Sequence, residues 1–462
     1  MNESAATPPT ARSLTPEVIS ALTSRPIRTE PHTAHDEWAG RTLQHLLGTE
    51  RAVSETWAFF SGPNTPSRLA GPGVDGLTMH DVVTALPEVL GPTGADPDHH
   101  NQKYFFVKFL DPSDFPPFAY VGLNPETVEA LGKTPEAFAT SFAALLWEDR
   151  QTLASLIELI RPHVRSRSAF ERFKAAYKRW AIAQATTGWT GAAALALEPF
   201  VAPSQHAAAR AHVARQCEVR HRIVRLMHRI DYAPDQAILI ETPTLHAIAG
   251  LSLQVHPKTP GNFHPKDELW IYKEIPLADG KRGWILVEPQ RTFDRTESGA
   301  DFFTPFAWEG NAERGSLGFR KSISRSSIEA FVALMDATPR PRNRYIRTVQ
   351  PMTAPEVSTQ GQARWHRVVE EPDWPYFLVR ELRFEGPGES RLPLAHHSFI
   401  ELHATHGTVD VILSAPHGTA HQFTVTPAHP AFLPACLPYE TITYRARHPA
   451  HLLFFTRPES TR

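Results

Sequence analysis

The chain has 462 residues, 41% of them hydrophobic, and a formal net charge of −2. This length predicts two or three domains, and the near-zero charge argues against a surface that attracts nucleic acid or anionic lipid. No apolar run approaches the roughly 20 residues that span a bilayer, and the first residues lack the basic and apolar regions of a secretory signal. The two cysteines, Cys217 and Cys436, are most simply buried thiols in a reducing compartment. We therefore expect a cytoplasmic protein that binds neither nucleic acid nor membranes.

The first part of the chain, residues 1–35, opens with a stretch rich in Ser, Thr and Pro that predicts disorder. From residue 38 to residue 125, short apolar runs alternate with turn-forming residues. Two of these runs, residues 103–110 and 118–123, are typical of buried strands.

Residues 126–231 have a helical pattern, because apolar residues recur there at spacings of three and four. Thr134 and Pro135 are suited to the N-cap and first position of the first long helix. Arg and His are dense in this region but follow the helical period. Solvated faces of amphipathic helices are therefore favoured over a nucleic-acid surface.

Strands return after residue 232, in the segments AILIE, LSLQVH, ELWIYKEI and GWILVEPQ. A helix is predicted at residues 324–337, followed by a linker rich in Pro and Arg at residues 338–345. The remaining residues, from about 349 to 462, form short strands only, with the spacing of a small antiparallel barrel or jelly roll.

Four polar residues stand out in these strands. Gln254 and His256 share one face of LSLQVH because side chains alternate along a strand. Glu268 opens the strand ELWIYK, on the face that also carries Trp270, and His246 ends another strand just upstream. If these strands neighbour one another in a barrel, the four polar side chains converge in its interior.

A polar interior of this kind costs several kcal/mol unless each group has a partner. One divalent cation bound by His246, Gln254, His256 and Glu268 would satisfy all four groups. The mixed nitrogen and oxygen ligands suit zinc, with manganese, iron or cobalt as further possibilities. With a single carboxylate ligand, the metal site keeps a net positive charge. A fifth coordination position on the metal can then stay open for a substrate oxygen. The alternative is a hydrogen-bonded Gln–His pair on a solvent-facing strand, with the glutamate on the surface.

These segments resemble the class I, cupin-type phosphomannose isomerases. LSLQVHP is similar to the family's strand with the Gln-x-His metal pair, HPKDELWIY to its glutamate segment, and ILIETPTLHAI to the segment whose histidine, here His246, is another ligand. The resemblance extends to residues 54–91, to VEPQRTFDRTESGADFF and AFLPACLPYETI, and to YFFVKFLD, in which Lys108 corresponds to a sugar-site lysine.

The resemblance implies a mainly β fold with a helical insertion, made of two or more cupin (jelly-roll β-barrel) domains and an all-α domain. It also implies a metal-dependent isomerase that interconverts mannose 6-phosphate and fructose 6-phosphate. Such an enzyme would hold one divalent metal per chain, zinc first, and would act as a monomer or homodimer. The expected divisions are a disordered N-terminus (1–35), a metal-binding cupin in two parts (36–125 and 232–340), a helical domain (126–231) and a C-terminal cupin (341–462).

The chain also departs from the family pattern. Gly122 and Asn124 stand where the family's Gln-x-His pair would follow the lysine strand, and Ser298 stands where the family has an arginine. By this resemblance, the chain is similar to a divergent member of the class I phosphomannose isomerase family. These departures favour an alternative in which a non-catalytic cupin binds a sugar phosphate or nucleotide sugar, as a sensor or partner subunit. An iron-dependent oxygenase and a helical protein-interaction module are further alternatives.

An aldose–ketose isomerase needs a base that moves a proton between adjacent carbons. Lys108, Glu288 and Asp294 are the candidates for this role. Arg291 or Arg295 could hold the phosphate with two parallel hydrogen bonds. Each of these residues also has a structural interpretation, as a strand-surface, turn or salt-bridge residue.

Overall fold

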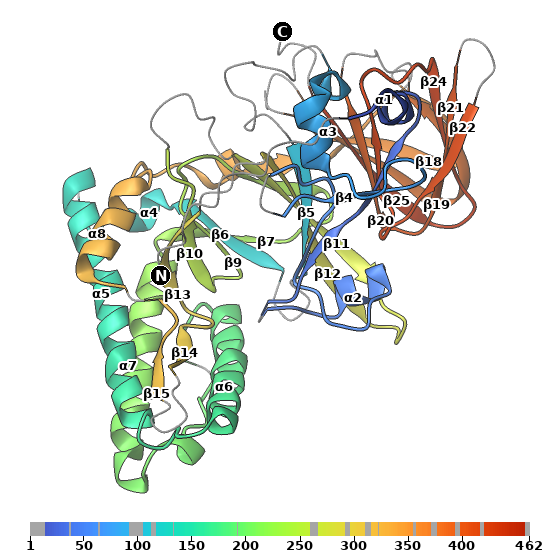
Figure 1. The fold of residues 1–462 in the computed structure, drawn as a ribbon. Helices are drawn as coiled ribbons and strands as arrows, with labels where there is room; N and C mark the ends of the chain where they lie inside the picture. Colours follow the sequence, from blue (N-terminus) through green and yellow to red (C-terminus); the bar gives the residue numbers. More distant parts are fainter. Residues whose placement is uncertain are drawn as a thin grey trace.

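The computed structural model describes residues 14–36, 38–62, 65–91, 105–111, 117–132, 134–191, 193–258, 267–291, 296–309, 316–321, 323–353, 357–370, 377–392, 398–415 and 420–457. The long helices gather at one end of the molecule, and the largest sheet lies at the other (Figure 1). The predicted class, mainly β with a helical insertion, is confirmed. None of the described helices is long and apolar enough to cross a membrane.

The helices range from single turns to one of 26 residues. The α-helices are α1 (Pro16–Thr23), α2 (Thr42–Leu47), α3 (Met79–Ala85), α4 (Pro125–Val128), α5 (Pro135–Ile160), α6 (Arg167–Thr186), α7 (His206–Val224) and α8 (Arg325–Leu334). The 3₁₀ helices are η1 (Pro87–Leu90), η2 (Glu198–Phe200), η3 (Pro203–Gln205) and η4 (Arg342–Tyr345).

The longest helix, α5, begins where the sequence predicts. Thr134 Oγ1 accepts a hydrogen bond from the Ala137 amide at 3.2 Å, and Pro135 lies in the first turn. The apolar face of α5 packs against α7 and α8. A buried ion pair joins the two long helices, because Arg220 Nε on α7 lies 2.8 Å from Asp149 Oδ1 on α5.

Two predictions about the helices and termini were wrong. The helical pattern was expected to continue to residue 231, but α7 ends at Val224 and β7 (Met227–Asp231) pairs with β6. The apolar residues at positions 227 and 230 continue the helical spacing, but pairing with a neighbouring strand decides the structure here. Residues 14–35 were expected to be disordered, yet they form α1, β1 and β2, with β1 paired to strands on both sides.

Of the two cysteines, Cys217 is buried as expected, but Cys436 is exposed.

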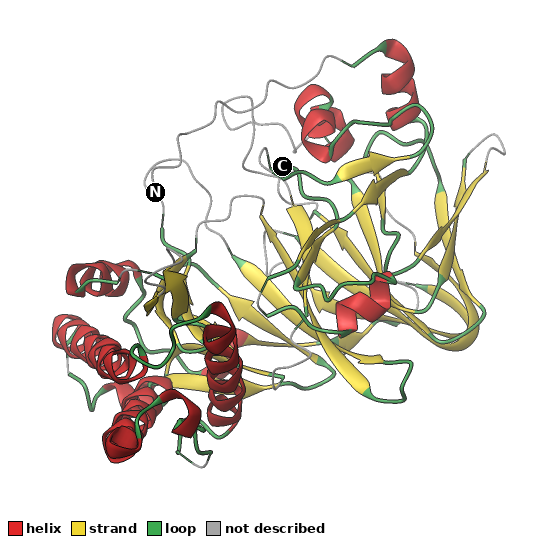
Figure 2. Ribbon diagram, turned by 60° about the horizontal axis from the view of Figure 1, so that its bottom comes forward, coloured by secondary structure: helices red, strands yellow, loops and turns green. Residues whose placement is uncertain are grey.

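Two smaller sheets occupy the middle of the molecule (Figure 2). In spatial order, the seven-stranded sheet contains β16 (Ile346–Thr348), β8 (Gln236–Ile240), β11 (Glu268–Pro276), β12 (Arg282–Arg291), β5 (Phe105–Leu110), β3 (Glu55–Trp57) and β2 (His32–Ala34). The five-stranded sheet contains β13 (Glu297–Asp301), β10 (Ser252–Val255), β9 (His246–Ile248), β6 (Phe118–Leu123) and β7. Each sheet therefore combines strands from before and after the long helices.

The 11-stranded sheet forms the C-terminal end of the molecule. Its main path is β22 (Ala420–Val425), β21 (Val409–Ser414), β24 (Thr441–Ala446), β19 (Leu378–Leu392), β25 (Ala450–Thr456), β20 (Ile400–His406), β23 (Ala431–Leu433), β1 (Ile27–Glu30) and β4 (Arg68–Ala70). Off this path, β18 (Ser358–Val369) pairs with β19 and with β17 (Gln350–Pro351). A separate hairpin, β14 (Phe306–Glu309) and β15 (Ser316–Phe319), contacts α5 and α6.

Apolar side chains join the C-terminal sheet to the seven-stranded sheet. Leu453 and Phe455 on β25 share one buried cluster with Leu269 and Ile271 on β11 and Val287 on β12. This cluster packs the C-terminal sheet against β11 and β12, the strands that carry Glu268 and Glu288.

Gly122 in β6 is a position that requires glycine. Its φ is +59°, and the pairing of β6 with β7 shifts register around it. A Cβ atom at this position would overlap the buried ring of Tyr345. Gly122 therefore allows the close packing of β6 against η4.

We expect Gly122→Ala to lower the free energy of unfolding by roughly 2–5 kcal/mol. The left-handed backbone accounts for about 1–2 kcal/mol, and overpacking against Tyr345 for about 1–3 kcal/mol. Denaturant unfolding followed by tryptophan fluorescence measures the loss. Gly48→Ala is the matched control, because Gly48 has φ +64° and nothing within 4 Å of an added Cβ. Equal losses in the two variants would contradict the contact with Tyr345.

Candidate metal centre

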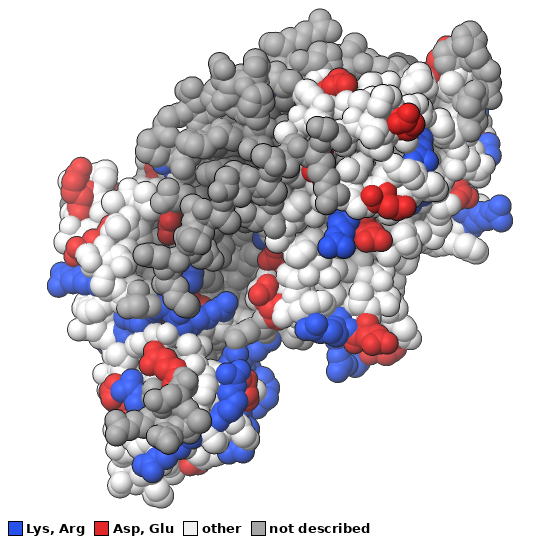
Figure 3. All heavy atoms as spheres, viewed as in Figure 1, with Lys and Arg blue, Asp and Glu red and all other residues white. Residues whose placement is uncertain are grey.

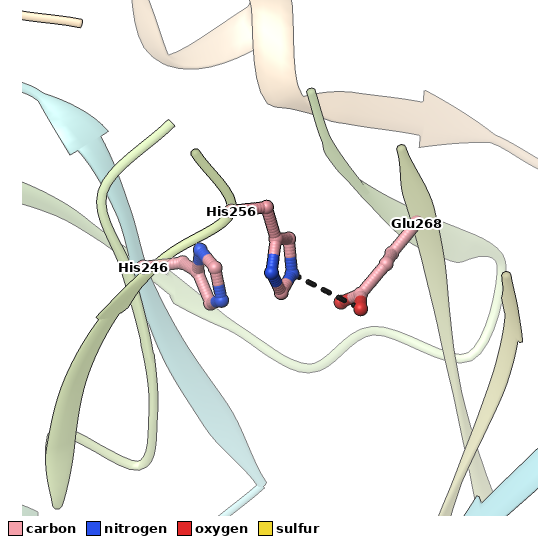
Figure 4. Close-up of side chains that lie close together, drawn as sticks. All are labelled: His246, His256 and Glu268. Carbon is pink, nitrogen blue, oxygen red and sulfur yellow. Dashed lines mark ion pairs between the residues drawn. The ribbon is translucent and has the colours of Figure 1, made fainter. Parts of the chain in front are cut away.

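Three of the four predicted ligands come together between the two smaller sheets (Figure 4). The prediction that His246 ends a strand was wrong, because it is the first residue of β9, which pairs with β6 and β10. His256 follows the end of β10, and Glu268 is the first residue of β11. One ligand atom from each lies within 4.8 Å of the other two. The side chains are buried, at 1%, 2% and 1% exposure, so the cluster is part of the interior.

Hydrogen bonds orient each member of this cluster. His246 Nδ1 lies 2.9 Å from the Thr244 carbonyl oxygen, which can only accept, so we assign the proton of the neutral ring to Nδ1 and the lone pair to Nε2. Glu268 Oε2 accepts from the Trp270 indole at 3.0 Å. His256 Nδ1 lies 3.2 Å from Thr296 Oγ1. Contacts of this kind around ligand side chains are typical of metal sites.

The charge of the cluster fits a cation. Glu268 Oε1 lies 3.0 Å from His256 Nε2, and the His246 and His256 rings have their centroids 4.6 Å apart. A buried carboxylate is costly without a positive partner. Two imidazole nitrogens and one carboxylate oxygen are ligands that divalent transition metals accept. The cluster could therefore hold one divalent metal ion.

Gln254, the fourth predicted ligand, lies beside this cluster. It is the Cα partner of His246 across β9 and β10, and it lines the same cavity as His256 and Glu268. The pairing of β10 with β13 shifts register between Leu253 and Gln254, and such irregularities re-aim side chains. Its role as a ligand stays a prediction.

The cluster opens on a cavity of about 380 Å³ between the facing sheets. Lys108 and Glu288 line it and are Cα partners across β5 and β12, which places them side by side on the inner face. Glu288 is 4% exposed. The structure thus brings these two candidate catalytic residues to the cavity beside His256 and Glu268, two of the candidate metal ligands.

Sequence reasoning missed Glu55, which lines the same cavity. Glu55 Oε2 accepts from the Trp57 indole at 2.7 Å and lies 3.0 Å from Lys108 Nζ. The Lys108 ammonium also lies 5.1 Å from the centre of the Trp57 ring. The sequence did contain a signal for Glu55. The pattern Glu-x-Trp occurs both at residues 55–57 and at residues 268–270.

Two exposed cations at the cavity were also missed. Arg320 and Lys321 follow β15 and line the cavity. Arg320 Nη1 donates to Thr304 Oγ1 at 3.2 Å, and the Thr304 amide donates to Asp301 Oδ1 at 2.8 Å. On the face shown in Figure 3, several Lys and Arg side chains gather on the helical region, with acidic side chains among them.

The remaining predicted residues are only partly described. Arg291 is the last residue of β12, but its side chain lies outside the described residues, as do Asp294 and Arg295 entirely. Asn124 has a structural use, since its Oδ1 accepts from the Glu126 amide at the start of α4. Ser298 lines the cavity and is the Cα partner of Gln254.

No family model matches the chain, and no curated protein sequence matches it. Among solved structures, an Archaeoglobus fulgidus protein provisionally assigned as a mannosephosphate isomerase is similar over 94% of this chain and 99% of that chain, with 8% identity and a TM-score of 0.42. Streptomyces albus HEPD with 2-hydroxyethylphosphonate and Fe(II) bound matches 49% of this chain and 62% of that chain, with 11% identity and a TM-score of 0.24. The Schizosaccharomyces pombe Cnp3 cupin domain matches 23% of this chain and 73% of that chain, with 14% identity and a TM-score of 0.17. At such identities the similarity concerns the fold and says nothing of substrate.

Proposed function

We propose that this chain is a metal-dependent aldose–ketose isomerase that interconverts mannose 6-phosphate and fructose 6-phosphate. The observation that carries the proposal is the buried cluster of His246, His256 and Glu268 at a cavity that also holds Lys108 and Glu288. The cavity volume of about 380 Å³ lies in the ordinary range for small-molecule sites. The resemblance of the strand segments to the cupin-type phosphomannose isomerases supports the choice of substrate.

The reaction moves a proton between two adjacent carbons and develops negative charge on the neighbouring oxygens. A divalent cation held by the cluster, most simply zinc, would supply positive charge for those oxygens. The Glu288 carboxylate is the base we favour, because it is buried, faces the cavity and lies beside a cation. It would take the proton from one carbon and return it to the next.

Other side chains of the cavity would bind and orient the sugar. Lys108, whose Nζ lies 3.0 Å from Glu55 Oε2 and whose Cα pairs with that of Glu288, can donate hydrogen bonds to a sugar hydroxyl. Arg320 and Lys321 are exposed cations suited to a phosphate. Asp294, Arg291 and Arg295 stay candidates for the base and the phosphate partner.

The test is conversion of mannose 6-phosphate to fructose 6-phosphate by zinc-loaded protein, followed by NMR. We expect turnover by the wild type and a kcat lower by roughly 10²–10⁴-fold in Glu288→Gln, because the base is lost. Metal content should be the same in both proteins. Glu309→Gln is the control, since it makes the same substitution at an exposed residue of β14.

Absence of turnover with the metal in place would contradict the proposed isomerase activity. Saturable binding of mannose 6-phosphate without product would then support the non-catalytic sugar-phosphate protein. The glycine at position 122 and the serine at position 298, where the family pattern has functional side chains, favour that second candidate.

A further inference from the structure

Trp270 makes two contacts with the metal cluster. Its indole Nε1 donates to Glu268 Oε2 at 3.0 Å, and its ring meets the His246 ring edge-on, with centroids 5.5 Å apart and an interplanar angle of 83°. The other oxygen, Glu268 Oε1, faces His256 Nε2 at 3.0 Å. The two oxygens of one carboxylate are therefore engaged in different directions, one by a tryptophan and one toward the cluster.

We propose that Trp270 is a positioning residue that determines the metal preference of this site by making Glu268 a one-oxygen ligand. The inference rests on the metal site of the proposed function and goes further by assigning the residue that sets the preference of that site for one class of ion. Carboxylates that bind through both oxygens suit larger cations with many oxygen ligands. One carboxylate oxygen with two imidazole nitrogens suits zinc and similar ions with few ligands.

The surroundings of Trp270 keep this hydrogen bond in place. The side chain is 1% exposed, and Trp270 is the Cα partner of Ile238 on the neighbouring strand β8. Turning the indole away from Glu268 would leave a buried N–H without its acceptor, at a cost of about 1–3 kcal/mol. Glu268 and Trp270 lie two residues apart on one strand, so both side chains face the cavity by the alternation of β11.

The same pairing recurs on another strand of the sheet, where it has a different partner. Trp57 Nε1 donates to Glu55 Oε2 at 2.7 Å, and the cation beside that oxygen is Lys108 at 3.0 Å. Here the protein's own ammonium group neutralises the carboxylate, whereas at Glu268 two imidazoles lie next to it. Trp57→Phe is therefore a matched control. It removes the same kind of indole–carboxylate hydrogen bond at Glu55, whose neighbouring cation is Lys108.

The experiment compares Zn²⁺ and Mn²⁺ binding by the wild type, Trp270→Phe and Trp57→Phe, in competition with a chromophoric chelator. Phe at position 270 keeps an aromatic ring against His246 but has no N–H. We expect Trp270→Phe to lower Zn²⁺ affinity by roughly 10–100-fold, as loss of a partner of a ligand typically does. Mn²⁺ affinity should fall less, so the preference for Zn²⁺ over Mn²⁺ drops by about tenfold or more. Trp57→Phe should keep the wild-type preference.

An unchanged preference in Trp270→Phe would overturn the inference. The visible spectrum of the wild type loaded with Co²⁺ tests it without any substitution, should the variant fail to fold. Strong bands typical of four or five ligands would support a site that selects ions with few ligands, and the weak bands of six ligands would overturn that class of ion. These readouts do not depend on turnover, so failure of the isomerase assay with normal metal preference would contradict the proposed reaction alone.

Discussion

A variant carrying both His246→Ala and His256→Ala is expected to retain no stoichiometric metal and to lose the proposed activity. The two imidazoles supply two of the three ligand atoms that lie within 4.8 Å of one another. A complete zinc site contributes about 10–16 kcal/mol through four ligands, so each ligand is worth on the order of 3 kcal/mol. Loss of two ligands should therefore weaken binding by roughly 10⁴-fold. Metal analysis of the purified protein and chelator competition measure the effect.

The control for this variant is a buried histidine elsewhere. His403 on β20 is 2% exposed, as is His256, but it packs against Phe59 and Phe109 rather than at the cluster. His403→Ala should keep the wild-type metal content even if it is less stable. If the double variant kept its metal, the assignment of the ligands would be wrong.

Glu381→Gln is expected to lower the free energy of unfolding by about 3–5 kcal/mol, because it breaks a buried ion pair. Lys273 Nζ lies 2.6 Å from Glu381 Oε1, and the two side chains are 7% and 0% exposed. Arg383 Nη2 lies 2.8 Å from the other oxygen. Lys273 is on β11, the strand that begins with Glu268, and Glu381 is on β19. The pair thus joins the strand that carries Glu268 to the C-terminal sheet.

Denaturant unfolding at neutral pH measures this loss. The double variant Lys273→Met with Glu381→Leu is the control, because it removes both charges and leaves apolar groups of similar size. It should recover much of the stability lost by Glu381→Gln. A loss in Glu381→Gln below about 1 kcal/mol, the value of an exposed pair, would contradict the structural role of this ion pair.

The same ion pair predicts a dependence of stability on pH. Burial alone would raise the pKa of Glu381, but the charges of Lys273 and Arg383 outweigh it and bring the pKa to about 2. A carboxyl whose pKa is lowered by folding stabilises the protein above its unfolded pKa, which is about 4.3. The difference in stability between the wild type and Glu381→Gln should therefore shrink as the pH falls from about 4.3 toward 2.

Much of the candidate site could be predicted from local patterns. Strand alternation placed His256 and Glu268 on buried faces, and the structure brings both to one cluster with His246. The start of α5 at Thr134 and Pro135 also followed from the sequence, because capping depends on neighbouring residues only. Patterns of this kind extend over a few residues, and there the predictions agree with the structure.

Other features had no local signal. The strand β1 joins the C-terminal sheet beside β23, across about 400 residues of chain, and β4 pairs with β1 in turn. Nothing in the sequence of β1 predicts β23 as its partner. In residues 227–231 the apolar residues stand at positions 227 and 230, a spacing that fits a helix, yet pairing with β6 decides for strand. Glu55, Arg320 and Lys321 line the cavity together with residues far from them in the chain, and nothing in their local sequence predicts those neighbours.

The sequence by itself determined the chemistry that is available: two imidazoles and a carboxylate at or next to the ends of strands, a helical region between two β regions, and the first residue of the longest helix. The tertiary structure alone decided that a five-stranded and a seven-stranded sheet face each other, and so which side chains share one cavity. The physical reason is the separation along the chain over which each effect acts. Alternation and capping act between residues a few positions apart, whereas the pairing and packing of sheets depend on contacts between residues far apart in the chain.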